Sequence, residues 1–421
     1  MLRFNKTKMF LSIYLFCFIY APPVIKVNFI YIVAAWAYVL LTLKYKDVVT
    51  KLLKNKKVFF FNLGIMCVLG YYIVMAILDN LYFKSGVQFQ NYLMVMYRFF
   101  TILFVIEPVV IYIIAFAKKR KLMIKDIIEC IIYAGLIESG FSILCLISPT
   151  IKLQLNTIMF ANASSKDITE MALWQYNGRY YGFSEVLVDL FGFGSGIIAG
   201  ICMLYGYYVD SKFYKFFPFL FIMTAINAIT GVIIIGVAVF FVIINSRLNK
   251  KRICTILSAP LVIICMFFIM NAVAPNALNR LINNFWAVFD STKVTTLVTS
   301  VDILFNEKFW NLPENWYQII FGTGHSVYGA QNFGHSDVGY INNIWSFGLV
   351  GSSMLYITYY KFIMKTKENL SNVYQKTQLY LFIALMVFEI KAVGIGCNPG
   401  NVVIILLIFV INFLDKKEVC E

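Results

Sequence analysis

Long apolar runs recur along the whole chain and constrain its fold more than any other feature of the sequence. They fall near residues 9–24, 27–43, 58–78, 93–117, 127–147, 185–209, 216–245, 253–271, 338–360, 377–396 and 401–414. A run of about 20 apolar residues is long enough to cross the roughly 30 Å hydrocarbon core of a bilayer as a helix. Backbone polar groups in lipid must be satisfied within the segment, and these runs lack the alternation of barrel strands, so helices are predicted.

The composition agrees with burial in lipid. Hydrophobic residues make up 61% of the chain and charged residues only 14%, with a mean hydropathy of +0.77. A soluble domain carries about 25% charged residues to cover its surface. The chain is therefore predicted to be an all-α, polytopic membrane protein with a single transmembrane domain over residues 1–421.

The net charge of +15 is concentrated in the connectors between apolar runs. These connectors hold 26 of the 36 Lys and Arg residues but only 7 of the 21 acidic residues, and they are 1–8, 44–57, 118–126, 210–215, 245–252, 361–376 and 415–421. Such a bias is the positive-inside pattern, which places the connectors and both termini in the cytoplasm. It accounts for the charge without a nucleic-acid partner, and none is expected.

The run at 216–245 breaks the alternation of sides because basic residues flank it at both ends. Two short crossings, or a re-entrant pair, turning near 227–231 would restore the alternation and give about twelve transmembrane helices. Two long outer loops follow from this topology, 148–184 and 272–337, the second between helices 9 and 10. Long ordered loops are usually functional, so candidate residues are sought there first.

Both histidines of the chain, His325 and His335, lie in the second outer loop among glycines, and Ser336 and Asp337 follow directly. Imidazole is the natural group for proton transfer near neutral pH. Two surface histidines in a glycine-rich loop are the simpler interpretation, and the sequence leaves both open.

Arginine is placed as selectively as histidine. Arg179 and Arg280 lie in the two outer loops, where topology does not need a positive charge. Arginine binds phosphate oxygens in a bidentate manner, whereas the alternative role for an arginine near the membrane surface is snorkelling to the interface. Glu185 lies close to Arg179 in the sequence, and pairing between the two is the simpler role for this carboxylate. Trp316 could stack on a sugar ring or anchor the chain at the interface.

Several short motifs together resemble the Wzy-type polysaccharide repeat-unit polymerases, within the wider O-antigen ligase and polymerase superfamily. The matching segments are 177–182 (NGRYYG), 227–231 (NAITG), 321–326 (FGTGHS), 335–337 (HSD) and 348–351 (GLVG). Ile229 departs from the family, since many relatives have an arginine in its place. The resemblance covers the whole topology, but at the level of residues it is confined to these segments.

The resemblance implies a membrane glycosyltransferase that polymerises undecaprenyl-diphosphate-linked oligosaccharide repeat units into a capsular or O-antigen polysaccharide, at the outer face of the bacterial plasma membrane. No metal or other cofactor is expected. The implied site residues are Arg179 and Arg280 for the diphosphate, His335 as general base with Asp337 orienting it or the sugar, His325 as a further catalytic candidate, and Glu185, Tyr180, Ser336 and Trp316 in support.

The lipid bilayer is a predicted partner, and a chain-length regulator and a separate flippase are candidate partners. Two other functions stay open at the level of the sequence. An oligosaccharide ligase would share the fold and the leaving group but use a different acceptor. A flippase or other transporter of lipid-linked oligosaccharide should instead have short outer loops and a cationic cavity along many helices.

Overall fold

The computed structural model describes residues 6–24, 26–83, 89–162, 179–185, 188–244, 307–326, 336–364 and 372–414, with single positions between 268 and 282. Every described element of secondary structure is a helix, and these ranges contain no strand. The all-α prediction is therefore confirmed. Most of the predicted run at 253–271 lies outside the described residues.

The long helices follow the predicted apolar runs. They are α1 Lys6–Tyr20, α2 Phe29–Lys44, α4 Lys56–Leu78, α5 Phe89–Thr101, α6 Glu107–Lys119, α7 Ile124–Ile147, α10 Val188–Tyr208, α11 Phe217–Asn227, α12 Ile229–Ile244, α17 Gly339–Met364, α18 Asn372–Glu389 and α19 Pro399–Phe413. Shorter elements are α3 Lys46–Leu53, α8 Pro149–Asn162, α16 Trp316–Phe321, the 3₁₀ turns Ser211–Phe216 and Glu307–Trp310, and the π-helical turns Asp79–Phe83 and Ile102–Ile106. The segment predicted as the first outer loop thus contains a helix, α8.

Several of these helices have the length and composition of membrane spans. Four stretches qualify individually, namely Lys56–Leu81, Phe89–Lys119, Ile124–Ile147 and Leu190–Tyr208, and the bent pair α2–α3 would make a fifth. The chain is accordingly described as a membrane protein. The total of about twelve crossings stays a prediction.

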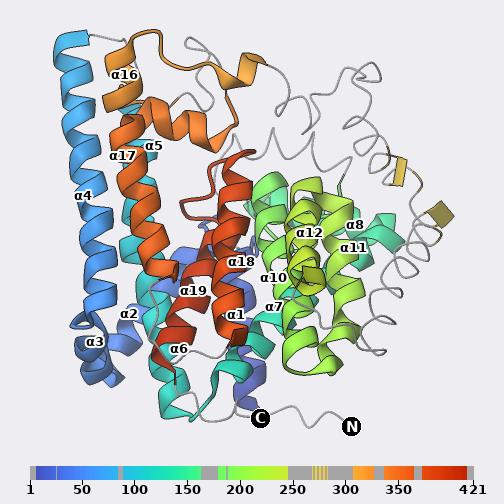
Figure 1. The fold of residues 1–421 in the computed structure, drawn as a ribbon. Coiled ribbons are helices and arrows are strands. Elements are labelled where there is room, and N and C mark those ends of the chain that lie inside the picture. The colour runs from blue at the N-terminus through green and yellow to red at the C-terminus, as the bar shows by residue number, and fades with distance from the viewer. Residues whose placement is uncertain are drawn as a thin grey trace.

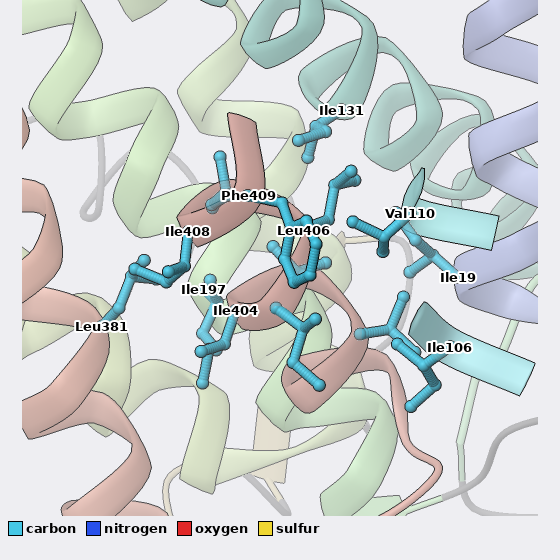
Figure 2. Packing of buried hydrophobic residues seen from close by; sticks show 14 of the residues in the cluster. Ile19, Ile106, Val110, Ile131, Ile197, Leu381, Ile404, Leu406, Ile408 and Phe409 are labelled. Carbon is cyan, nitrogen blue, oxygen red and sulfur yellow. The ribbon is translucent and has the colours of Figure 1, made fainter. Parts of the chain in front are cut away.

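Helix α19 forms the centre of the bundle (Figure 1) and is surrounded by α1, α6, α7, α10 and α18. Every residue from Pro399 to Ile411 is buried, and apart from Asn401 this stretch is apolar on all sides, as expected of a helix with apolar neighbours all round. Figure 2 shows this packing around Leu406 and Phe409, with Ile19, Ile106, Val110, Ile131, Ile197 and Leu381 contributed by the neighbouring helices.

Helices α11 and α12 turn back on each other at 227–228, where the sequence predicts a break. Helix α11 begins after the short 3₁₀ turn that follows α10, and α12 returns parallel to α10. Gly192 of α10 faces Gly231, and Gly200 faces Ala238 further along both helices. With 11 residues, α11 is about 16 Å long, which is too short to cross the bilayer. The predicted break is therefore confirmed, and α11 forms the short arm of the hairpin.

Ion pairs bring three of the predicted cytoplasmic connectors together at one end of the bundle. The Lys8 ammonium lies 2.6 Å from carboxylate oxygens of both Asp126 and Glu129, and Lys212 lies 3.8 Å from Glu129. These residues come from the starts of α1 and α7 and from the turn after α10. Segments that the positive-inside pattern assigns to one compartment thus meet at one end (Figure 1).

Helix α17 bends sharply at Gly348, which has φ 63° and ψ −174° (Figure 1). The bend lets the backbone of Gly322 pack directly on that of Gly348: a Cβ on Gly322 would lie 2.5 Å from the Gly348 nitrogen. Tyr71 of α4 donates a hydrogen bond of 2.7 Å to the carbonyl of Phe321. Glycine is required at both Gly322 and Gly348. Each has a positive φ that disfavours other residues, and neighbouring backbone leaves no room for a Cβ.

Replacing Gly348 by alanine is expected to lower the free energy of unfolding by about 1–3 kcal/mol, because alanine must adopt a positive φ against neighbouring backbone. The measurement is the thermal unfolding midpoint of the purified protein in detergent. Gly70→Ala is the control, since its Cβ would meet no atom within 4 Å. That control is expected to be neutral or to stabilise by up to about 1 kcal/mol. Equal midpoints for the two variants would contradict the account.

Candidate functional site

Five of the non-helical segments in the described ranges lie at the end of the bundle opposite the ion-paired connectors. They are 179–185, the turn at 227–228, 322–326, 336–338 and 390–398. Helices α4, α7 and α18 each begin at a basic connector and run toward these segments. At membrane depth, irregular backbone is tolerated only where it is buried in protein or lines a water-filled cavity. This end, which the positive-inside pattern predicts to face outward and which is called the outer end below, is therefore where the fold can hold a polar site.

Arg179 lies at this outer end, half-buried, beside the turn between α11 and α12. Its Nη1 donates two hydrogen bonds of 2.9 Å, one to the carbonyl of Asn227 and one to the hydroxyl of Tyr181. That carbonyl belongs to the C-terminal end of α11, where the helix dipole favours a positive charge. Nε and Nη2 of Arg179 form no hydrogen bond or ion pair with any residue that the structure describes.

The backbone beside Arg179 is held by the side-chain amide of Asn227. Its Oδ1 accepts from the nitrogen of Tyr180 at 2.8 Å, and its Nδ2 donates to the carbonyl of the same residue at 3.1 Å. Nδ2 also donates to the carbonyl of Met223 at 2.9 Å, which fixes the amide on α11. Asn227 therefore positions both the backbone and the guanidinium of the Arg179 segment.

The other end of the same segment is held by α7 and by the end of α1. The carboxylate of Glu138, fully buried in α7, accepts from the nitrogen of Phe183 at 3.2 Å. The hydroxyl of Ser184 donates to the carbonyl of Tyr20 at 2.9 Å. Gly182 packs so closely on α7 that a Cβ would lie 2.7 Å from Glu138. The sequence marks Glu138 only as an ionisable residue at membrane depth.

Two predicted supporting residues lie in this segment. Glu185 is buried, and its backbone nitrogen donates to the carbonyl of Tyr20 at 3.3 Å. Among the residues that the structure describes, no ion pair joins it to Arg179, so the pairing suggested by their spacing is not observed. The ring of Tyr180 is covered by the ammonium of Lys152, 4.3 Å from its centroid.

His325 is almost completely buried, with 3% of its surface exposed. Its Nδ1 lies 3.5 Å from Oδ2 of Asp79, and the hydroxyl of Tyr92 donates to the same oxygen at 2.6 Å. The Trp345 ring packs beside the imidazole, with 5.6 Å between centroids. In this arrangement His325 fixes the 322–326 segment to α4 and α5, and its catalytic role stays a prediction. Sequence reasoning missed Asp79, for which the signal was a lone acid directly after an apolar run.

Asparagines also hold the backbone beside His325. Asn91 accepts from the nitrogen of Ser326 and donates to its carbonyl, both at 2.9 Å. The hydroxyl of Ser326 donates to Oδ1 of Asn342 at 2.9 Å, and Nδ2 of Asn342 donates to the carbonyl of Ser336 at 2.8 Å. Ser336 itself is buried, and its hydroxyl donates to the carbonyl of Phe309. The predicted role of Ser336 is therefore accompanied by a clear structural one.

Four predicted site residues remain, of which the structure describes two, Asp337 and Trp316. Asp337 is half-buried two residues before α17 begins, next to Ser336. Trp316 is 70% exposed on α16, as an interfacial anchor or a sugar platform requires. His335 and Arg280 lie outside the described residues.

Glu389 organises the connection between α18 and α19, and the sequence marks it, like Glu138, only as an ionisable residue at membrane depth. Its Oε1 accepts from the backbone nitrogens of Gly394 and Ile395, at 2.9 and 3.1 Å. Its Oε2 accepts from Nδ2 of Asn343 at 3.0 Å and from the hydroxyl of Tyr356 at 3.2 Å. Four donors satisfy this buried carboxylate, which indicates a structural role at the outer end.

The structure brings Arg179 and His325 to the same end of the bundle but attaches them to different helices. Arg179 is held by α11, and His325 packs on α4, α5 and α17. Within the described ranges no hydrogen bond, ion pair or ring contact joins the two side chains. The Arg179 segment and the His325 segment are therefore held separately, each by its own set of polar side chains.

Comparison of the chain with protein-family models, curated proteins and solved structures found no match.

Replacing Asn227 by alanine is expected to lower the free energy of unfolding by about 1–3 kcal/mol, because the buried amide pairs with Tyr180 and Met223 are lost. Trypsin should also cut faster after Arg179, since the adjacent backbone is no longer held. Both effects are measured on the purified protein, by thermal unfolding and by mapping tryptic fragments over time. Asn315→Ala, at an exposed position, is the control. Unchanged cleavage after Arg179 in Asn227→Ala would contradict the positioning role.

Proposed function

We propose that this chain polymerises undecaprenyl-diphosphate-linked oligosaccharide repeat units into a capsular or O-antigen polysaccharide at the outer face of a bacterial plasma membrane. In this proposal the chain has about twelve transmembrane helices, both termini in the cytoplasm, and the large outer loop between helices 9 and 10. The observation that carries the proposal is the placement of Arg179 at the end opposite the basic connectors.

The bonding of Arg179 supports diphosphate binding. Both of its hydrogen bonds use Nη1, and they fix the plane of the guanidinium against Asn227 and Tyr181. Nε and Nη2 remain available to meet two phosphate oxygens, which is the geometry that arginine offers and lysine does not. Helix α12 begins at Ile229, so its positive N-terminal end lies near the same turn. A guanidinium held in advance loses little entropy when the anion binds.

The reaction needs few groups from the protein. A hydroxyl at the non-reducing end of one lipid-linked unit attacks the anomeric carbon of the growing chain, and the bond from that carbon to the lipid diphosphate breaks. The diphosphate leaves with the bonding electrons, and Arg179 and Arg280 compensate its charge. One positioned donor of this kind contributes a few kcal/mol in the transition state. The hydroxyl proton goes to His335 as general base, a role worth about 10²–10⁴-fold, and Asp337 orients this histidine or the sugar.

The products that accumulate separate this function from the two alternatives. Loss of a polymerase leaves single repeat units that still reach the outer face. Loss of a ligase leaves long chains that are not joined to their final acceptor, and loss of a flippase leaves lipid-linked units on the inner face. A gel of the surface glycan, combined with digestion from outside the cell, distinguishes the three outcomes.

Arg179→Gln is expected to reduce surface glycan to single repeats, because the positive charge and the paired N–H donors of the guanidinium are both lost. Arg179→Lys keeps the positive charge but lacks the paired N–H donors, and it should give shortened chains. The readout is the glycan ladder on gels, with the amount of protein in the membrane checked by immunoblot. Arg120→Gln removes an exposed arginine from the opposite end and is expected to leave the ladder normal. Normal long chains from Arg179→Gln would reject the assignment of this arginine.

A further inference from the structure

Lysine side chains crowd around α3 at the inner end of the bundle. Five of them are exposed between residues 44 and 56, and they are Lys44, Lys46, Lys51, Lys54 and Lys56. Asp47 is the only acid in that stretch. None of the five forms an ion pair with any residue that the structure describes. This charge is therefore not balanced by neighbouring carboxylates.

The fold lays α3 across the end of α2, since the two helices meet at an angle of 103°. The apolar face of α3 packs inward, with Leu52 buried and Val48 and Val49 half-buried against the core. Its lysines point away from that face. This is the arrangement of an amphipathic helix that lies along a membrane surface rather than crossing it.

Packing adds a second basic segment that is distant in the sequence. Residues 118–121 form the end of α6 and the start of its connection to α7, and all four are basic and exposed. The Lys119 ammonium lies 5.5 Å from the centroid of the Tyr45 ring, at the joint between α2 and α3. The two segments thus form one surface, here called the α3 basic patch, made of Lys44, Lys46, Lys51, Lys54, Lys56, Lys118, Lys119, Arg120 and Lys121.

Two other lysines at the same end, Lys8 and Lys212, form ion pairs with carboxylates. Lys8 lies between Asp126 and Glu129, and Lys212 lies near Asp210 as well as Glu129. Orienting the helices requires only that basic residues lie inside, and paired lysines serve that purpose as well as unpaired ones. The α3 basic patch therefore has an excess of positive charge that topology alone does not require.

Two exposed leucines indicate where the counter-charge comes from. Leu43, at the end of α2, is 75% exposed and Leu53, at the end of α3, is 46% exposed. Apolar side chains beside the lysines place the patch at the boundary between lipid tails and water. The anions present at that boundary are phospholipid headgroups, which attract clusters of basic residues directly cytoplasmic of a membrane span.

We infer that the α3 basic patch binds anionic phospholipid of the inner leaflet and prefers a headgroup with two phosphates. Two phosphates match a patch formed from two basic segments, one on α3 and one between α6 and α7. The inference does not depend on the proposed polymerase function.

The test is lipid binding by the purified full-length chain in detergent, followed by native mass spectrometry. The probes are tetraoleoyl cardiolipin with two phosphates, dioleoyl phosphatidylglycerol with one, and zwitterionic dioleoyl phosphatidylcholine. The patch variant carries Lys46→Gln, Lys51→Gln, Lys54→Gln and Lys118→Gln. The control variant removes the same charge elsewhere on the inner end, through Lys6→Gln, Lys125→Gln, Lys215→Gln and Lys361→Gln. Thermal unfolding without added lipid confirms that both variants fold.

The wild-type chain is expected to bind cardiolipin more tightly than phosphatidylglycerol and to show no specific binding of phosphatidylcholine. The patch variant should bind cardiolipin at least about tenfold more weakly, and the control variant less than about threefold more weakly. Equal loss in the two variants, or no loss in the patch variant, would overturn the inference. Displacement of cardiolipin by inorganic pyrophosphate at similar concentration would also overturn it, since the patch would then be a site for soluble anions.

Discussion

The structure depends on one constraint, which is that backbone polar groups within a bilayer must be satisfied by the protein itself. Helices meet this requirement internally, and in this chain the buried central helix α19 does so in a stretch that is apolar apart from Asn401. The end of the bundle opposite the basic connectors contains irregular segments, and polar side chains of the protein pair with part of their backbone groups instead. Asn91, Asn227, Asn342, Glu138 and Glu389 perform this task.

An asparagine side chain pairs with both backbone groups of a single residue at two places at the outer end. Asn227 pairs with both backbone groups of Tyr180, and Asn91 pairs with both backbone groups of Ser326. Each pair fixes a segment that carries a predicted functional residue, Arg179 in one case and His325 in the other. Rigid support of this kind is what a site needs when it binds a charged group, because a preorganised cation keeps its geometry without reorganisation.

Much of the helical arrangement could be predicted from the sequence. The length of each apolar run and the excess of Lys and Arg in the connectors beside it are properties of neighbouring residues, so they can be read without knowing the tertiary structure. The break near Asn227 is an example, since basic residues at both ends of one apolar run leave few alternatives. The partners of His325 could not be predicted in this way. Asp79 and Tyr92 lie more than 200 residues away in the sequence, and only tertiary packing brings them together. Likewise, spacing suggested that Glu185 pairs with Arg179, whereas the fold turns the guanidinium toward Asn227.

The central claim is that the Arg179 segment and the His325 segment face the compartment opposite the lysine-rich end. The most direct measurement is labelling of single introduced cysteines in intact cells with a membrane-impermeant maleimide. Gln154→Cys and Glu314→Cys, at exposed positions near the two segments, should be labelled from outside, whereas Lys51→Cys should react only after the membrane is permeabilised. Labelling of Lys51→Cys from outside, or protection of either Gln154→Cys or Glu314→Cys, would contradict the account.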